Sequence, residues 1–205
     1  MIEEEKRRAY LTWWTENGTA SDMAATHPKC ACESAIATSD GFGPVEGSEV
    51  IRYFVASRSD IDLKRSPNKS VTSAIFNRAF NRGVSTARLR YASRDELNLT
   101  ARLLFDYQVK ECGEYGGILG VVDFHATAVR QVPNFDFQLC CVLDTPLDGR
   151  MSHADVVSSI GDVEPEEKKG IKLALFNAVG GAVAFKRADE IADCDLTQML
   201  PAKLG

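Results

Sequence analysis

The 205-residue chain contains no long apolar run and few aromatic residues. No stretch approaches the roughly 18 consecutive apolar residues that a membrane-spanning helix needs, so we expect no membrane association. Aromatic residues make up 8% of the chain, yet 44% of the residues are hydrophobic and 26% are charged. This balance excludes the disordered and collagen-like classes. The sequence therefore predicts an ordinary soluble globular protein.

Familiar catalytic motifs are also missing. The chain has no Gly-x-x-x-x-Gly-Lys-Ser/Thr, no Gly-x-Gly-x-x-Gly after a strand, no His-Glu-x-x-His and no Gly-x-Ser-x-Gly. These absences exclude the commonest NTPases, dehydrogenases, zinc proteases and hydrolases in their familiar forms. The zinc deaminase signature is absent as well. Because the chain has three histidines, any histidine-based chemistry must use His27, His125 or His153.

Residues 1–8 are strongly charged, where a secretory signal would need an apolar stretch. We therefore expect a cytoplasmic protein whose six cysteines form no disulfides. Cys140 and Cys141 are neighbours on a predicted strand, so their side chains should face opposite ways and pack as small apolar groups.

Hydrophobic periodicity predicts an α+β fold, with a mixed or antiparallel sheet, packed helices and an N-terminal helical arm. We expect residues 1–48 to form an N-terminal helix and irregular arm, and residues 49–205 to form the main α+β domain. The Gly-rich run 41–47 has the wrong spacing for phosphate binding and should be a loop. Helices are expected at 2–16, 69–82, 93–112, 152–160 and 164–180, and strands at 49–56, 84–91, 117–131, 135–144 and 182–186.

Three local signals are more specific. Ser93 and Glu96 match a capping box, in which the Ser hydroxyl and the Glu carboxylate each accept from a backbone N–H of the first helical turn. Pro133-Asn134 separates two runs with a period of two and predicts a hairpin. Ser152 resembles the N-cap of a short helix, which would place His153 at the positive end of the helix dipole.

Basic residues are concentrated in one segment of a chain whose net charge is −5. From Arg58 to Arg94 there are nine basic residues against two acidic ones, with aromatic residues in between. This pattern favours a binding or adaptor protein that engages an anionic partner, whether nucleic acid, nucleotide or acidic protein surface. The candidate anion-binding residues are Arg78, Arg82, Arg88, Arg90 and Arg94. Alternatively, the arginines pair with acids of the same chain or a partner subunit, and Phe76 and Phe80 form the buried stripe of a helix.

An enzyme is the competing hypothesis. Asp123 and His125 lie two apart on a predicted strand and share a face, so they can bind a metal or orient a general base. With His153, and with Arg88 and Arg90 as an anion clamp, they would act on a phosphorylated or carboxylated small molecule. The alternative is a half-buried histidine hydrogen-bonded to its neighbouring aspartate.

A third hypothesis is an interaction module stabilised by zinc. His27, Cys30 and Cys32 can supply three of the four tetrahedral ligands from one loop. Cys112, Cys194 and His153 are candidates for the fourth. The same two cysteines also suit thiol chemistry, since Lys29 would lower a thiol pKa, or simple packing beside a turn.

Trp13 and Trp14 end the predicted first helix. Tryptophan is enriched at binding hot spots, so we consider these two as contacts with a protein partner or a second copy of the chain. Packing inside the fold is the alternative. The sequence leaves the identity of any partner and the oligomeric state open.

Overall fold

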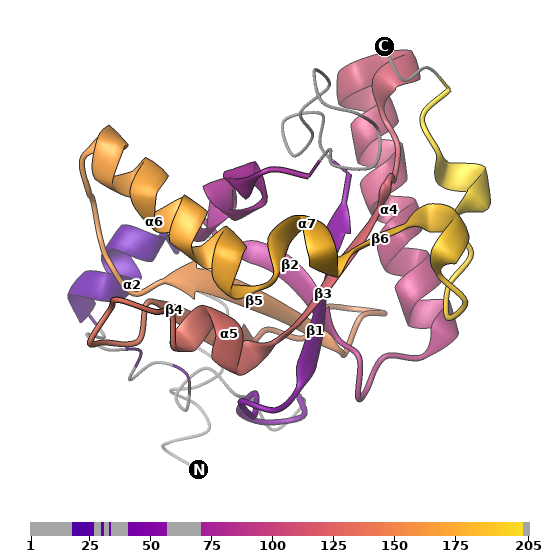
Figure 1. Ribbon diagram of the computed structural model, residues 1–205. Coiled ribbons are helices and arrows are strands. Elements are labelled where there is room, and N and C mark those ends of the chain that lie inside the picture. The colour runs from indigo at the N-terminus through magenta and orange to yellow at the C-terminus, as the bar shows by residue number, and fades with distance from the viewer. Residues whose placement is uncertain (1–17, 27–29, 31–32, 34–40, 57–70, 203–205) are drawn as a thin grey trace.

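The computed structural model describes residues 18–26, 30, 33, 41–56 and 71–202. These residues form a six-stranded sheet with helices on both of its faces (Figure 1). The predicted α+β class, with an antiparallel sheet and packed helices, is confirmed. The helix predicted at 2–16, with Trp13 and Trp14, lies outside the described residues.

All neighbouring strands of the sheet run antiparallel, in the order β4-β5-β2-β1-β3-β6. The strands are β1 (Val50–Val55), β2 (Val84–Arg88), β3 (Gly120–His125), β4 (Cys140–Asp144), β5 (His153–Ser158) and β6 (Phe185–Arg187). β-branched and aromatic residues dominate β1, which fits the pleated, buried position that this strand occupies. The predicted strands at 49–56 and 84–91 correspond to β1 and β2.

One face of the sheet is covered by η4 (Ser73–Phe80), α5 (Ala126–Arg130) and α6 (Pro165–Ala178), as Figure 1 shows. The main core lies beneath these helices, where Phe76 of η4 and Leu175 of α6 pack against Ile51, Val122 and Val156 of the sheet. Short elements complete this part of the chain: α7 (Gly181–Ala184), η6 (Ala188–Glu190) and η7 (Thr197–Met199).

The other face carries α4 (Arg94–Cys112), followed by η5 (Gly113–Tyr115), and, nearer β4 and β5, α2 (Ala20–Thr26). Leu97 and Ala101 of α4 pack with Phe54, Ala87 and Val121 of the sheet. Met23 of α2 packs with Leu143 and Val157 in a separate apolar cluster. α2 therefore packs on the sheet although it belongs to the predicted arm, and the division of domains at residue 48 stays a prediction.

The helix predicted from Ser93 is confirmed as α4. Its N-terminus differs from the predicted capping box in the partner of Glu96. Ser93 is the N-cap, and its hydroxyl accepts from the backbone N–H of Glu96 at 3.2 Å. The Glu96 carboxylate accepts from the backbone N–H of Ser152 at 2.5 Å, rather than from Ser93. Glu96 thus ties α4 to the chain entering β5. The helix predicted at 164–180 is confirmed as α6, and the one at 69–82 is a 3₁₀ helix, η4.

The predicted hairpin between 117–131 and 135–144 is wrong. β3 ends at His125 and the chain continues as α5, whose residues Ala126 and Val129 are buried three positions apart. β4 then lies at one edge of the sheet, whereas β3 lies beside β6 near the other. The apparent period of two across 117–131 combined a strand with one turn of helix.

The predicted helix from Ser152 to Ile160 is also wrong. Residues 153–158 form β5, and all six side chains are buried. A strand covered on both faces shows no alternation of polar and apolar residues, so its pattern resembles that of a short buried helix. His153 therefore lies on a strand, and no helix dipole acts on it from Ser152.

Cys30 and Cys141 form a disulfide, contrary to the expectation of reduced cysteines. The bond joins the segment after α2 to β4 and lies in the apolar cluster around Met23. Cys140 faces the main core as a free thiol, packs as predicted, and burial raises its pKa. None of the described helices is long and apolar enough to cross a membrane.

The outer edge of β4 is occupied by a side chain. Glu33 Oε1 accepts from the backbone N–H of Val142 at 2.7 Å, from the Gln138 amide at 2.8 Å and from Arg130 Nε at 3.1 Å. One carboxylate thus stands where a further strand would pair.

The cap of α4 yields a stability prediction. Ser93→Ala removes the acceptor for the Glu96 N–H and should lower the free energy of unfolding by about 1 kcal/mol, measured by urea denaturation. Ser93→Asp keeps an acceptor at the N-cap and should unfold at nearly the wild-type midpoint. Equal midpoints for wild type and Ser93→Ala would show that the cap contributes nothing.

Candidate functional site

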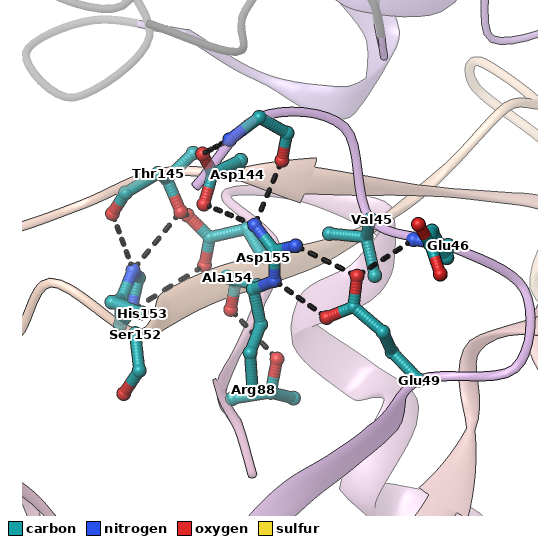
Figure 2. A network of polar contacts seen from close by, with 12 residues as sticks. Val45, Glu46, Glu49, Arg88, Asp144, Thr145, Ser152, His153, Ala154 and Asp155 are labelled. Carbon is teal, nitrogen blue, oxygen red and sulfur yellow. Dashed lines mark hydrogen bonds and ion pairs between the residues drawn. The ribbon is translucent and has the colours of Figure 1, made fainter. Parts of the chain in front are cut away.

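A network of buried polar side chains joins β2, β4 and β5 to Glu49, the residue before β1 (Figure 2). At its centre is Arg88, whose side chain is fully buried at the end of β2. Its Nε and Nη2 donate to the two oxygens of Glu49 at 2.8 and 2.7 Å. Its Nη1 donates to Asp144 Oδ1 and to the carbonyl of Gly43, both at 2.8 Å.

The charges of this network depend on one another. Burial alone would raise the pKa of Glu49, but hydrogen bonds from Arg88 and from the Glu46 N–H, together with nearby positive charge, lower it overall. Burial raises the pKa of Asp144 despite Arg88 and the backbone N–H groups that it accepts from. Burial would lower the pKa of Arg88, and its two carboxylate partners outweigh that effect and raise it.

The Gly-rich run 41–47 is a loop, as predicted, and it closes over Asp144. The N–H of Gly43 donates to Asp144 Oδ2 at 3.0 Å. A Cβ on Gly41 would lie 2.2 Å from the same oxygen, so the loop can approach the carboxylate only with glycine there. Phe42 in this loop stacks on Tyr91 with ring centroids 4.0 Å apart, and the Arg88 guanidinium lies 4.7 Å from the Tyr91 centroid.

A second polar chain lies on the other face of the same strands, because side chains alternate along a strand. Ser85 of β2 places its Oγ 2.6 Å from Nε2 of His153 on β5. His153 Nδ1 lies 2.8 Å from the backbone carbonyl of Thr145 and 2.9 Å from its hydroxyl. The Thr145 hydroxyl in turn donates to Asp155 Oδ2 at 3.0 Å. Figure 2 shows the part formed by Thr145, His153 and Asp155.

The direction of these hydrogen bonds follows from the partners. The Thr145 carbonyl can only accept, so Nδ1 of His153 carries the proton. In a neutral ring Nε2 then has the lone pair, and the Ser85 hydroxyl donates to it. The other oxygen of Asp155, Oδ1, lies 4.0 Å from Nε2. His153 is buried and Ser85 is half-buried.

The sequence identified His153 but not Ser85. Their proximity arises from the pairing of β2 with β5, in which Ser85 is opposite Asp155 and Ala87 is opposite His153. The two strands are separated in the sequence by α4, β3 and β4. No local motif marks such a pair, and the serine belongs to no elbow-type sequence.

Asp123, the other predicted catalytic carboxylate, is held in an ion-pair network. Arg52 Nε and Nη2 donate to its two oxygens at 2.7 and 2.8 Å, and Lys186 Nζ lies 3.0 Å from Oδ2. Burial would raise the pKa of Asp123, but Arg52 and Lys186 together lower it. Arg52 also donates to Asp193 at 2.5 Å. Asp123 thus joins β1, β3 and β6 as a charged group.

The structure does not bring Asp123 and His125 together with His153. His125 is exposed at the end of β3, where its Nδ1 lies 2.9 Å from the carbonyl of Ser48. β3 and β5 are separated by β2 and β1, which is about 14 Å at the usual strand spacing. A shallow pocket of about 550 Å³ beside Arg52 and Asp123 does not include His125 or His153.

Four of the five candidate anion-binding arginines lie on the surface: Arg78, Arg82, Arg90 and Arg94 are exposed, whereas Arg88 is buried. Arg90 pairs with the exposed Glu46 at 3.3 Å. Phe76 lies in the main core, as the alternative interpretation expected, and Phe80 packs against it. The basic residues from Arg58 to Lys69 lie outside the described residues.

The predicted zinc loop is described only at Cys30. Its sulfur is bonded to Cys141, so it is no thiolate ligand in this state. His27 and Cys32 lie outside the described residues. Across the described part of the chain, no three His, Cys, Asp or Glu side chains gather as a metal site.

Comparison of the chain with protein-family models, with curated proteins and with solved structures finds no match. Function is therefore inferred from the geometry of these residues alone.

The Arg88 network yields a second prediction. Glu49→Gln leaves half of a fully buried guanidinium without its charged partner, so it should cost about 3–5 kcal/mol of folding free energy. Glu46→Gln, in the exposed pair with Arg90, should cost about 0–1 kcal/mol. Chemical denaturation at pH 7 measures both.

The stability lost in Glu49→Gln should depend on pH. Because the pKa of Glu49 is lowered in the folded protein, its contribution is complete above its ordinary pKa and is lost as pH falls through the lowered value. The difference between wild type and Glu49→Gln should therefore shrink on acidification. A difference that is independent of pH would contradict the ionised pairing.

Proposed function

We propose that the protein is an enzyme that hydrolyses an ester through Ser85 as nucleophile and His153 as general base. The observation that supports this proposal is the 2.6 Å contact between Ser85 Oγ and His153 Nε2, with Nδ1 held by the Thr145 carbonyl at 2.8 Å. A nucleophile hydrogen-bonded to a base that a third group orients is the arrangement by which proteins activate serine.

The reaction proceeds in two balanced steps. Ser85 Oγ attacks the ester carbonyl carbon while its proton passes to His153 Nε2. The tetrahedral intermediate then expels the alcohol, which takes that proton from His153, and leaves an acyl-serine. In the second step water gives a proton to His153 and attacks the acyl carbon. Ser85 recovers the proton as the acid leaves.

Thr145 and Asp155 are positioning residues in this scheme. Thr145 fixes the tautomer of His153 through Nδ1, so that Nε2 faces Ser85. When Nε2 takes the serine proton, the imidazolium has the Asp155 carboxylate 4.0 Å away as a counter-charge. Ser85 is partly exposed, as a residue that meets a substrate must be.

Labelling with a fluorophosphonate tests the nucleophile. The reagent forms a phosphorus–oxygen bond to an activated serine with loss of fluoride, and mass spectrometry of the peptides should place the adduct on Ser85. Ser85→Ala should remove the adduct. His153→Gln should reduce its rate of formation by about 100-fold or more, because the base is lost.

Ser159→Ala is the matched control. The Ser159 hydroxyl is half-buried like that of Ser85, but it donates to the carbonyls of Gln138 and Leu139 and has no base beside it. This variant should label at the wild-type rate. Absence of an adduct on Ser85 in the folded protein, or a rate unaffected by His153→Gln, would reject the enzyme. Circular dichroism confirms that each variant is folded.

A second candidate function is the predicted binding of an anionic partner, and one observation favours it. η4, which carries Arg78 and precedes Arg82, packs against α6, where Lys172 donates to Asn77 at 2.7 Å. Burial and the charges of Lys168 and Lys169 lower the pKa of Lys172, so these amines lie close together. Arg78 follows Asn77, the residue that Lys172 contacts, and we call these residues the η4–α6 basic surface: Arg78, Arg82, Lys168, Lys169 and Lys172.

This second function predicts salt-dependent binding of a single-stranded oligonucleotide. Arg78→Ala and Arg82→Ala should each weaken binding and lower the slope of log affinity against log salt by about 1. Arg102→Ala, an exposed arginine of α4, is the control and should leave affinity unchanged. Fluorescence anisotropy at 50–200 mM salt, a range in which such contacts respond strongly, measures the effect. Failure of the wild type to bind would exclude nucleic acid.

Location and assembly remain predictions of the sequence. The disulfide between Cys30 and Cys141 is more typical of oxidising compartments than of the predicted cytoplasm. The predicted contacts of Trp13 and Trp14 with a protein partner or a second copy remain hypotheses.

A further inference from the structure

Arg150 is a partly buried arginine with one unpaired donor, Nε, among the described residues. Its Nε is shielded from solvent and makes no hydrogen bond. Buried donors in folded proteins are nearly always hydrogen-bonded, and an exception calls for an ion or water in the complete site. An arginine offers a planar fork of donors that fits carboxylate or phosphate oxygens in pairs.

The backbone places Arg150 three residues before His153 and bonds its carbonyl to the His153 N–H. Arg150 lies in the turn between β4 and β5, where its N–H donates to the Leu147 carbonyl at 2.8 Å. Its own carbonyl accepts from the N–H of Leu147 at 3.2 Å and from that of His153 at 3.1 Å. Gly149, with φ of +68°, allows the turn to close. The same turn therefore places both His153 and Arg150.

The carboxylates of Asp155 and Glu96 lie near Arg150. Burial lowers the pKa of Arg150, and the charges of Asp155 and Glu96 oppose that effect, so both acids are close. Their oxygens have other contacts, since Asp155 accepts from Thr145 and Glu96 accepts from Ser152. Asp155 is also the cross-strand neighbour of Ser85. Arg150 thus has an unused Nε donor and lies close to Asp155, the strand neighbour of Ser85.

We infer that Arg150 binds an oxyanion, a carboxylate or phosphate group carried by the substrate, and holds the ester for attack by Ser85. This inference rests on the proposed function and gives the substrate class as an anionic ester. The Arg150 guanidinium acts on substrate binding. Its loss should therefore raise KM for an anionic ester and leave KM for a neutral ester unchanged.

Binding of anions tests the inference without any turnover. Inorganic phosphate and succinate are titrated separately against the whole protein, with chloride at equal ionic strength as the reference, and the shift in Tm is followed. At least one of the two should raise Tm in wild type and in Ser85→Ala, and the more effective one identifies the group. Arg150→Met should lose the shift, whereas Arg102→Met should keep it. No shift in wild type, or a shift that survives in Arg150→Met, would overturn the inference.

Turnover then separates the inference from the enzyme proposal. Wild type should prefer mono-4-nitrophenyl succinate over 4-nitrophenyl acetate in kcat/KM, and Arg150→Met should lose about tenfold or more on the succinate ester alone, through KM. Arg150→Lys keeps the charge without the fork and should fall between the two. If neither ester is hydrolysed while the anion still shifts Tm through Arg150, the esterase fails and the anion site stands. Equal losses on both esters would overturn the role of Arg150 in recognising charge.

Discussion

The fold depends on the neutralisation of one fully buried charge. Arg88 is enclosed at the end of β2. Glu49, Asp144 and the Gly43 carbonyl accept four hydrogen bonds from its guanidinium, and these contacts offset the free-energy cost of burying the charge. These partners come from the residue before β1, from β4 and from the loop over Asp144, so a single guanidinium fixes three segments relative to β2. Such a contact adds little net stability compared with an apolar core, but it specifies which segments meet.

The same constraint positions the polar chain on the opposite face. Asp144 and Thr145 are consecutive, so anchoring Asp144 to Arg88 directs Thr145 towards His153. Ser85 and Arg88 lie on one strand, so the register that places Arg88 also places the serine hydroxyl. The turn that joins β4 to β5 also carries Arg150, whose carbonyl accepts from the His153 N–H. The Arg88 network and the Ser85–His153 pair therefore lie on opposite faces of the same strands.

Local sequence predicted those elements whose signals are local. β1, β2, α4 and α6 follow from β-branched runs, the Ser93 cap and Pro165 at the start of a helix. β5 was missed because burial on both faces removes the alternation that marks a strand. Ser85 was missed because its partner His153 is 68 residues away in the sequence, and no local pattern indicates that the two side chains meet. Charge patterning singled out Arg88 but gave only its sign, and its location in the core depends on acids 39 and 56 residues distant.

Glu33 has a consequence for the sheet as a whole. An edge strand with free N–H groups is a template for pairing with the same edge of another molecule, and this is how ordered aggregates begin. The Glu33 carboxylate occupies the N–H of Val142 in the middle of β4, and it brings Gln138 and Arg130 with it. An incoming strand would have to displace a charged group from three donors before its first hydrogen bond. The disulfide joins Cys30, three residues before Glu33, to Cys141 of the same strand, so two nearby residues of the chain contact β4 and hinder its pairing with another molecule.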